Sequence, residues 1–576
     1  MKKYSDEKNV QIVIALMKKH GIRKVVASPG ATNVSLVGSI QSDPFFEIYS
    51  CVDERSAAYM ACGLAEESGE AVALSCTGAT SSRNYLPALT EAYYRKLPVL
   101  TITSSQPNAR IGHLVPQVTD RSSPPPDTVK LSVQLPIVKD VNDEWECELK
   151  VNQAMLELRR RGGGPVHMNL PTLYSRNFAE ETLPDVRMIE RIVPEKSFPP
   201  LNGRVAIFVG SHSKMSAALT KAIDDFCQAN DAVVFCDHTS GYKGKYRVLW
   251  SLASVQKVNR AESRPDVLIH IGEISGAYMN VTGGQVWRVN EDGEIRDTFK
   301  KLRYVFEMPE ETFFSHYAKC GAKNGEDSYL RACNEALESL RKKIQDVPYS
   351  NIWVASKLSK SLPEGSVLHL GILNSLRSWN FFEIPASIAA YSNVGGFGID
   401  GGVSSLVGAS LANKEKLFFG VIGDLAFFYD MNVMGNRHIG RNLRLLLVNN
   451  GKGTEFKNFN HLAAHLGEQV DPFIAAAGHY GDKSPNLVKH YAESLGFEYF
   501  SASNKEEFEA TYLSFTAREL TDRPMLLEVF TTDTDESNAL ENLMSLEESV
   551  EAKAKDLVKS VLGNSGVAFA KKLLGK

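Results

Sequence analysis

The sequence predicts an α/β protein made of three consecutive domains, each built on a mostly parallel sheet. Short apolar runs rich in β-branched residues alternate with segments that carry Ala and Leu at helical spacing. This alternation is interrupted twice, by a proline-containing segment at 178–202 and by a charged helical segment at 329–345. A chain of 576 residues is also too long for one hydrophobic core. We therefore expect domains at 1–178, 203–345 and 350–535, followed by a helical tail at 536–576.

The elements of the first domain follow from its apolar runs. Helical periodicity predicts helices at 10–17 and 54–67. Short runs that end near Ser, Thr, Gly or Pro predict the strands, at 24–27, 71–74, 98–102 and 166–171.

The second and third domains repeat this pattern. The middle domain is expected to contain strands at 205–210, 232–236 and 267–272, before the helix at 329–345. In the third domain the apolar runs read as fully buried strands, at 366–370, 417–422, 443–448 and 525–530.

Composition excludes several functional classes. The chain has 64 Lys and Arg against 68 Asp and Glu, a net charge of -4, whereas nucleic-acid binders usually carry a basic excess. No window approaches 18 consecutive apolar residues, and the N-terminus lacks the pattern of a secretory signal. The eight cysteines form no CxxC pair, which favours a reducing compartment. We expect a cytoplasmic enzyme that binds neither nucleic acid nor a membrane.

Two polar side chains follow neighbouring buried strands of the third domain. Gly423-Asp424 ends one strand, and Asn449-Asn450 ends the next, 26 residues later. In a parallel sheet both strand ends meet at the edge where ligands bind. A carboxylate and an amide oxygen are ligands suited to Mg²⁺ that also contacts phosphate. The competing interpretation is an Asp that caps a helix and a simple Asn-Asn-Gly turn.

A GxGxxG sequence at 396–401 supports a rival hypothesis, a nicotinamide-dependent dehydrogenase. No clear apolar strand precedes this GxGxxG segment. The dehydrogenase hypothesis also leaves Asn449 and Asn450 without a role. A third possibility is a homologue that binds a cofactor without catalysing a reaction.

The pair formed by Gly423-Asp424 and Asn449-Asn450 resembles the metal–diphosphate motif of thiamine-diphosphate-dependent enzymes. The segment at 52–58 resembles the setting of that family's N-terminal glutamate, and the resemblance covers most of the chain. It implies thiamine diphosphate and Mg²⁺ as cofactors, a pyrimidine-binding first domain and a diphosphate-binding third domain. It also implies a homodimer, or a dimer of dimers, in which Glu54 of one subunit meets Asp424 and Asn450 of another.

The resemblance assigns roles to further residues. The metal ligands would be Asp424, Asn450 and the main-chain carbonyl of Lys452. The catalytic candidates are Glu54, Gln117, Glu455 and His113, with Glu54 acting on the aminopyrimidine ring. The cofactor would be bound by Ser375, Gly398, Ile399, Gly423, Leu425, Ala426 and Phe456.

Within the family, the chain most resembles the menaquinone-pathway carboligase, SEPHCHC synthase, on motifs such as 398–401 and 423–425. That enzyme uses arginines to bind its multiply charged substrates, and here Thr32, Gln106, Trp379 and Val394 stand in their places. Arg377 or Arg83 could compensate, and Trp379 with Phe381 and Phe382 could stack on a sugar or an apolar acceptor. We expect decarboxylation of a 2-oxo acid donor with carboligation to an acceptor carbonyl compound. Alternatives are simple decarboxylation to an aldehyde and true SEPHCHC synthesis.

Overall fold

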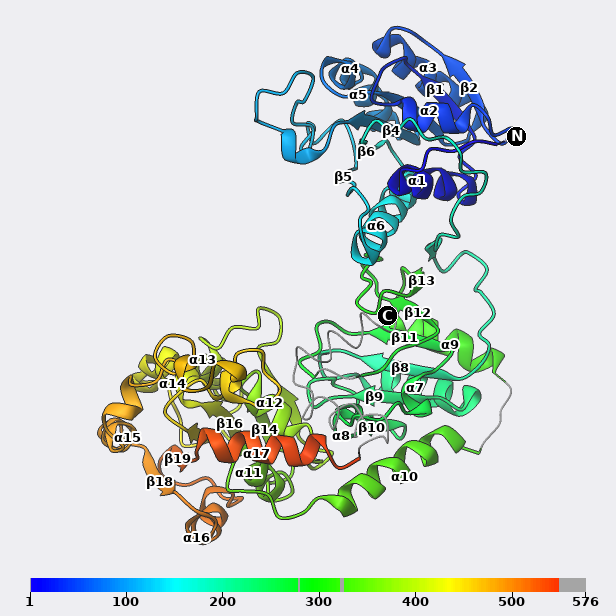
Figure 1. Cartoon of the computed structure of the whole chain (residues 1–576). Coiled ribbons are helices and arrows are strands. Elements are labelled where there is room, and N and C mark those ends of the chain that lie inside the picture. Colours follow the sequence, from blue (N-terminus) through cyan, green and yellow to red (C-terminus); the bar gives the residue numbers. More distant parts are fainter. Residues whose placement is uncertain (1, 278–279, 322–325, 548–576) are drawn as a thin grey trace, which may run out of the picture. The chain divides into compact units, whose positions relative to one another are not determined.

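The computed structural model describes residues 2–277, 280–321 and 326–547 (Figure 1). The chain divides into two compact units, one of Met1–Lys196 with Gly293–Glu307, the other of Ser197–Asp292 with the part that begins at Met308. Each unit is described by itself, and the finer division into three domains stays a prediction. In the described ranges, none of the helices combines the length and the apolar character needed to cross a membrane.

The first unit contains a six-stranded sheet in which all neighbouring strands are parallel. All six carboxyl ends therefore lie along one edge, where open α/β folds bind ligands. The strand order is β2 (Glu47–Ser50), β1 (Lys24–Ala27), β3 (Val72–Thr77), β4 (Val99–Ser105), β6 (Val166–Pro171) and β5 (Leu131–Gln134).

Helices cover both faces of this sheet. Val25 packs in the core on one side, and Val26 packs in the core on the other, because successive strand side chains point to opposite faces. The first core contains α1 (Lys8–Lys19), α2 (Val34–Ile40) and α6 (Val141–Glu157). The second contains α3 (Glu54–Ser68) and α5 (Leu86–Arg95), and the short α4 (Thr80–Asn84) precedes α5.

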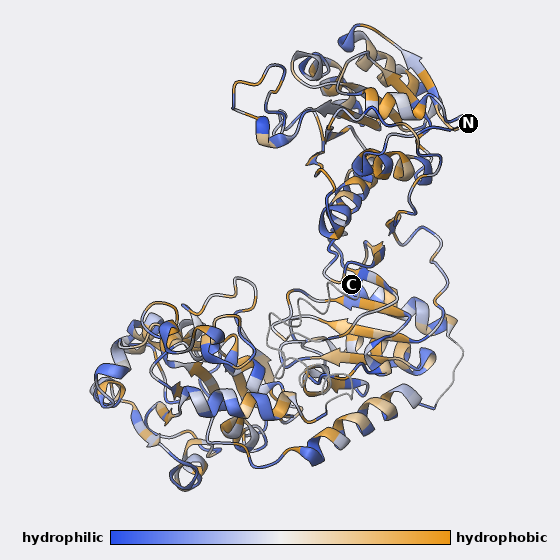
Figure 2. Cartoon of the chain, in the orientation of Figure 1, coloured by the Kyte–Doolittle hydropathy of each residue, from blue (hydrophilic) through white to orange (hydrophobic). Residues whose placement is uncertain are grey.

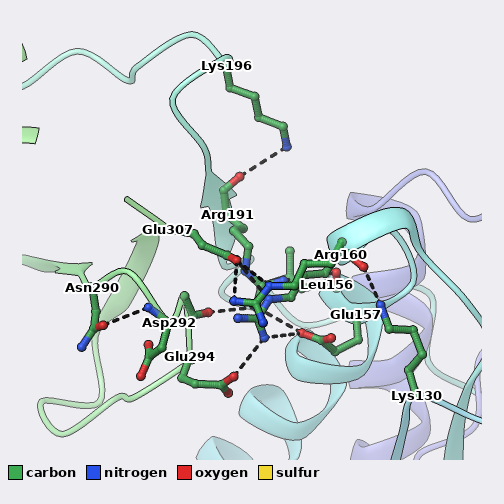
Figure 3. Close-up of polar contacts among 12 residues, drawn as sticks. Lys130, Leu156, Glu157, Arg160, Arg191, Lys196, Asn290, Asp292, Glu294 and Glu307 are labelled. Carbon is green, nitrogen blue, oxygen red and sulfur yellow. Dashed lines mark hydrogen bonds and ion pairs between the residues drawn. The ribbon is translucent and has the colours of Figure 1, made fainter. Parts of the chain in front are cut away.

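A cluster of charged side chains holds segment 293–307 to the rest of the first unit (Figure 3). Arg160 donates hydrogen bonds to Glu157 at 3.1 Å, to Glu294 at 3.0 Å and to Glu307 at 3.0 Å. Charge-assisted bonds of this kind are roughly twice as strong as neutral ones. A parallel strand pair joins the same segment, formed by β13 (Leu302–Phe306) and β7 (Glu190–Ile192).

The second unit begins with a sheet of parallel strands, which are drawn largely in orange in Figure 2 because their residues are mostly hydrophobic. Within this unit the strand order is β10 (Arg247–Leu249), β9 (Val233–Cys236), β8 (Val205–Val209), β11 (Val267–Ile271) and β12 (Gln285–Val289). The helices of this part are α7 (Ala217–Asn230), α8 (Ser251–Ser254), α9 (Glu310–Cys320) and α10 (Ser328–Lys343).

The second unit continues with another six-stranded parallel sheet. Its connections repeat the strand order of the first unit's sheet, although the two sequences show no obvious repeat. The order is β15 (Ala389–Tyr391), β14 (Val367–Leu370), β16 (Phe418–Gly423), β17 (Leu443–Asn449), β19 (Met525–Phe530) and β18 (Glu498–Ala502).

Helices again lie on both faces of this sheet. One face packs against α13 (Gly402–Leu411), α14 (Asp424–Asp430) and α15 (Leu487–Ser494). On the other, Phe419 of β16 meets Phe515 of α16 (Lys505–Phe515), with ring centres 5.7 Å apart. The remaining helices are α11 (Asn351–Leu358), α12 (Asn374–Trp379) and α17 (Asp533–Met544).

The predicted fold class is confirmed, because the sheets are parallel and interleaved with helices. The long buried strands lie within a few residues of their predicted positions. Short or half-exposed strands such as β2, β10 and β15 were not predicted, since they lack an apolar run. The predicted tail at 536–576 begins inside α17, and its part from residue 548 lies outside the described residues.

Candidate active site

The carboxyl edge of the third sheet brings the two predicted motifs together. Strand β16 ends at Gly423, and α14 begins at the next residue, Asp424. In the parallel pairing of β16 with β17, Gly423 lies opposite Val448, so β17 ends at the same edge and delivers Asn450 beside Asp424. The strand–helix–strand argument made from the sequence is therefore correct in its geometry.

Asp424 is buried, and two main-chain N–H groups hold its carboxylate. Leu425 N–H donates to one oxygen at 2.8 Å and Gly451 N–H to the other at 2.7 Å. Burial raises the pKa of Asp424 to about 6, against the opposing effect of these hydrogen bonds. A nearby cation would stabilise the ionised form of this buried carboxylate, because it offsets the free-energy cost of burying the negative charge.

The side chain of Asn450 leaves one buried acceptor open. Its Nδ2 donates to Thr454 Oγ1 at 3.3 Å, while its Oδ1 is buried and has no hydrogen-bond partner among the described residues. Leaving such an atom unsatisfied costs about 1–3 kcal/mol. The main-chain carbonyl of Lys452 accepts a hydrogen bond from Thr454 N–H at 2.9 Å. The side-chain Nζ of Lys452 pairs with the carboxylate of Asp471 at 2.8 Å. A carboxylate, an open amide oxygen and a carbonyl form the oxygen-rich donor set that Mg²⁺ prefers.

A cavity with about 1160 Å³ of empty space, partly open to solvent, surrounds this edge, and we call it the main cavity. Its wall includes all seven predicted cofactor-binding residues, the three predicted metal ligands and Glu455. Apolar residues such as Leu406 and Val421 line it as well. A largely apolar cavity with a few convergent polar groups is the common form of a cofactor site. The cofactor-binding set in its wall is Ser375, Gly398, Ile399, Gly423, Leu425, Ala426 and Phe456.

Several lining residues carried no signal in the sequence. Glu536 of α17 accepts hydrogen bonds from Asn351 N–H at 2.9 Å and from Thr531 Oγ1 at 2.8 Å. Burial raises the pKa of Glu536 to about 7. Asn351 in turn donates from Nδ2 to Ser375 Oγ at 3.3 Å. No spacing rule connects these distant segments, so only the fold brings them to the cavity.

Both carboxylate oxygens of Glu455 accept hydrogen bonds from the guanidinium of Arg377. Arg377 donates from Nη2 to one oxygen of Glu455 at 2.8 Å and from Nη1 to the other at 3.0 Å. Asn458 Nδ2 adds a bond of 3.1 Å to the same carboxylate, and Asn374 Oδ1 accepts from both Arg377 and Asn458. This bidentate pair neutralises the guanidinium that the sequence suggested as a substitute for the missing arginines.

None of the four positions that resemble the arginine sites carries a charge. Trp379 and Val394 are 0% and 3% exposed, so they belong to the core. Stacking of Trp379 on an acceptor, as the sequence suggested, is therefore wrong, because its ring has no open face. In the first unit, Thr32 donates to Ser104 carbonyl oxygen at 2.6 Å and Gln106 accepts from Arg110.

The other three predicted catalytic residues belong to the first unit. Glu54 begins α3, one residue after Asp53, whose carboxylate caps the helix by accepting from Ser56 N–H. Asn84 Nδ2 donates to Glu54 at 3.1 Å. His113 and Gln117 are exposed in the loop that follows β4, and Gln117 has a φ of 64°. All three thus follow strands at the carboxyl edge of the first sheet. Their catalytic roles stay predictions.

Known proteins match this chain along most of its length. Residues 8–123 match the family described as Thiamine pyrophosphate enzyme, N-terminal TPP binding domain. The 2-succinyl-5-enolpyruvyl-6-hydroxy-3-cyclohexene-1-carboxylate synthase (SEPHCHC synthase) of Bacteroides thetaiotaomicron is 31% identical over 570 residues, which cover 94% of this chain and 98% of that protein. The synthase of the same name from Phocaeicola vulgatus is 32% identical over 554 residues, covering 92% and 96%.

A solved structure, the thiamine diphosphate-dependent 4-hydroxybenzoylformate decarboxylase of Rhodococcus jostii RHA1, aligns with a TM-score of 0.40 and 17% identity. It covers 91% of this chain and 99% of that chain. On the evidence of the two full-length relatives, the chain belongs to the SEPHCHC synthase family and is a thiamine-diphosphate-dependent enzyme.

Proposed function

We propose that the enzyme decarboxylates a 2-oxo acid and joins the remaining fragment to an acceptor carbonyl compound, with Mg²⁺ as its metal. The bond between C1 and C2 of the donor breaks and C1 leaves as CO₂. The electron pair left on C2 forms a bond to the acceptor's carbonyl carbon, and the carbonyl oxygen takes up a proton. In the reaction that names the relatives, the bond would instead form to one carbon of a ring double bond conjugated with a carboxylate, and the other carbon of that double bond would take up the proton. Thiamine diphosphate, when bound, stabilises that electron pair, and the protein supplies binding and orientation.

The open oxygen of Asn450 beside Asp424 is the observation that carries this proposal. Mg²⁺ would be held by Asp424, Asn450 Oδ1 and the carbonyl of Lys452, and it would bind the negative diphosphate. Gly423, Leu425, Ala426 and Ser375 would lie against the diphosphate. Gly398, Ile399 and Phe456 would contact the rest of the cofactor, where Ile399 would act as the apolar support implied by the family resemblance.

Three residues of the first unit complete the proposed machinery. Glu54 would bond the aminopyrimidine ring and hold its proton in place. Gln117 would orient a substrate carboxylate without adding charge, and His113 would transfer a proton. Glu455 faces the main cavity, and its pairing with Arg377 favours a role in shaping the substrate site.

The acceptor has two candidates. The relatives favour the reaction in their name, because they are 31–32% identical over nearly their full length. The cavity favours a less charged acceptor, since Lys452 and Arg377 each pair with an acidic side chain. Carbon dioxide release from 2-oxoglutarate plus isochorismate, compared with pyruvate plus aldehydes and keto-sugars, decides between them. Release of a free aldehyde without an acceptor would indicate simple decarboxylation.

We also propose a homodimer, or a dimer of dimers, in the cytoplasm. The second unit exposes Leu462 by 80% and Phe473 by 92%, near the main cavity in sequence. Large apolar side chains this exposed are typical of surfaces that another chain covers. The balanced composition and unpaired cysteines favour the cytoplasm.

Calorimetric titration of thiamine diphosphate in the presence of Mg²⁺ tests the proposal. Asp424→Ala should weaken binding at least about 100-fold, equivalent to about 2.7 kcal/mol, because the diphosphate loses its bridging metal. Asp522→Ala, which removes an exposed carboxylate of a surface loop, serves as the control. Circular dichroism should show both variants folded. Wild-type affinity in Asp424→Ala would mean that the metal site lies elsewhere.

A further inference from the structure

A second cavity adjoins the main cavity, and we call it the side cavity. It has about 940 Å³ of empty space, part of which is open to solvent, and is lined by residues that include Ser251, Arg377, Asn380 and Phe381. Glu455 and Leu373 line both cavities. Glu455 and Leu373 therefore belong to the wall between the two cavities, and a substrate that reached from one cavity into the other would pass beside them.

The charges of the side cavity cancel each other. Apart from His461, Arg377 and Glu455 are the charged groups among the described residues that line it. Both oxygens of Glu455 accept from Arg377, at 2.8 and 3.0 Å, and the two side chains are only 20% and 24% exposed. This bidentate pairing balances the positive charge of the guanidinium and takes up its end-on pair of donors. A substrate carboxylate in the side cavity would therefore meet no net positive charge at Arg377 and would lie close to the negative carboxylate of Glu455.

Uncharged polar groups in the same wall lack partners. Asn380 is 1% exposed, and its Oδ1 accepts from His238 N–H at 2.9 Å. Its Nδ2 has no partner among the described residues, and neither does Oγ of Ser251, which is 5% exposed. Buried polar groups are rarely left unsatisfied. Hydroxyl or carbonyl groups of a ligand would satisfy both.

We propose that the side cavity binds the uncharged, hydroxyl-bearing part of the acceptor, and that Glu455 discriminates against anionic acceptors by occupying Arg377. The acceptor class is then a polyhydroxylated aldehyde or ketone without a carboxylate. This inference rests on the proposed function, because it takes the main cavity as the place of reaction. It makes Glu455 and Arg377 specificity-determining residues.

Acceptor selectivity tests the role of Glu455. With the holoenzyme and saturating pyruvate, kcat/KM is compared for D-erythrose, which is uncharged, and succinic semialdehyde, which carries a carboxylate. The wild type should prefer D-erythrose. Glu455→Gln should shift the ratio toward succinic semialdehyde by about tenfold or more, mostly through KM, because Arg377 regains a free charge. The double variant Glu455→Gln with Arg377→Gln should return the ratio toward the wild-type value. An unchanged ratio in Glu455→Gln would overturn the inference.

Binding without turnover separates this inference from the proposed function. Saturation-transfer NMR measures D-erythrose bound to the holoenzyme in the absence of a donor. Ser251→Ala should weaken that binding severalfold, whereas Ser254→Ala should not, since Ser254 lies on the same helix outside the cavity wall and bonds Ser251 carbonyl oxygen. Equal binding by the two variants would contradict the inference. Absence of CO₂ release from every 2-oxo acid would instead contradict the proposed function.

Discussion

Single side chains in this site differ in whether their polar groups are left open or satisfied. At the proposed metal site, the buried Oδ1 of Asn450 has no partner among the described residues and lies beside the carboxylate of Asp424, an arrangement that suits a cation. At the substrate end, Arg377 and Glu455 satisfy each other. The first arrangement favours a metal-bound diphosphate, and the second favours an uncharged substrate group.

Glu54 should be required for catalysis and not for cofactor affinity. Glu54→Gln keeps the size of the side chain but removes the carboxylate that would hold the aminopyrimidine proton. Carbon dioxide release should fall by about 10²-fold or more, the range typical of lost acid–base groups, while titrated thiamine diphosphate still binds. Glu67→Gln, on the exposed side of the same helix, is the control. A fully active Glu54→Gln variant would exclude this role.

The sequence was sufficient to predict that Asp424 and Asn450, the proposed metal ligands, lie close together, because strand ends of a parallel sheet share an edge. Asp424 and Asn450 follow two adjacent buried strands, so their convergence needed only strand–helix–strand geometry. Arg377 and Glu455 are 78 residues apart in the sequence, and no periodic pattern in the sequence predicts that they pair. Glu536 could not be identified for the same reason.

Secondary-structure elements were predictable where burial is continuous. β17 is buried at every position, and its apolar run is visible in the sequence. Strand β2 is half exposed, and β10 has three residues, so neither produces a distinctive pattern. These strands depend on their neighbours in the sheet, which is tertiary information.

A buried carboxylate joins α1 to the segment that follows α2. Asp43 accepts from Tyr4 hydroxyl at 2.7 Å, from Lys18 and from Phe45 N–H at 3.1 Å. Burial acts to raise the pKa of Asp43, but these hydrogen bonds outweigh it and lower the pKa from 3.8 to about 2. The ionised form is therefore stabilised by folding, by about 2 kcal/mol.

Asp43→Asn should destabilise the protein in a pH-dependent way. Because the pKa is lowered in the folded state, the contribution is present above the unfolded value and disappears as pH falls through the folded value. Urea unfolding should show a loss of about 2 kcal/mol near neutral pH and a much smaller loss near pH 2. Equal losses at both pH values would show that packing, not charge, accounts for the effect.

At the scale of the whole molecule, the described residues form two six-stranded sheets of identical strand order, and candidate site residues follow strands at the carboxyl edge of each. Glu54, His113 and Gln117 follow strands of the first, and Asp424 and Asn450 follow strands of the second. In the proposed dimer, the first edge of one subunit and the second edge of its partner form one site. The symmetry of such a dimer gives two equivalent sites.

Complementation between two inactive variants tests this account most directly. Co-expression of Glu54→Gln and Asp424→Ala chains with different affinity tags allows mixed dimers to be isolated. In a mixed dimer with shared sites, one site carries both substitutions and the other carries none, so each mixed dimer should release CO₂ at about half the wild-type rate. Each variant alone should be nearly inactive. Mixed dimers as inactive as the single variants would show that Glu54 and Asp424 do not meet across subunits in a shared thiamine-diphosphate site.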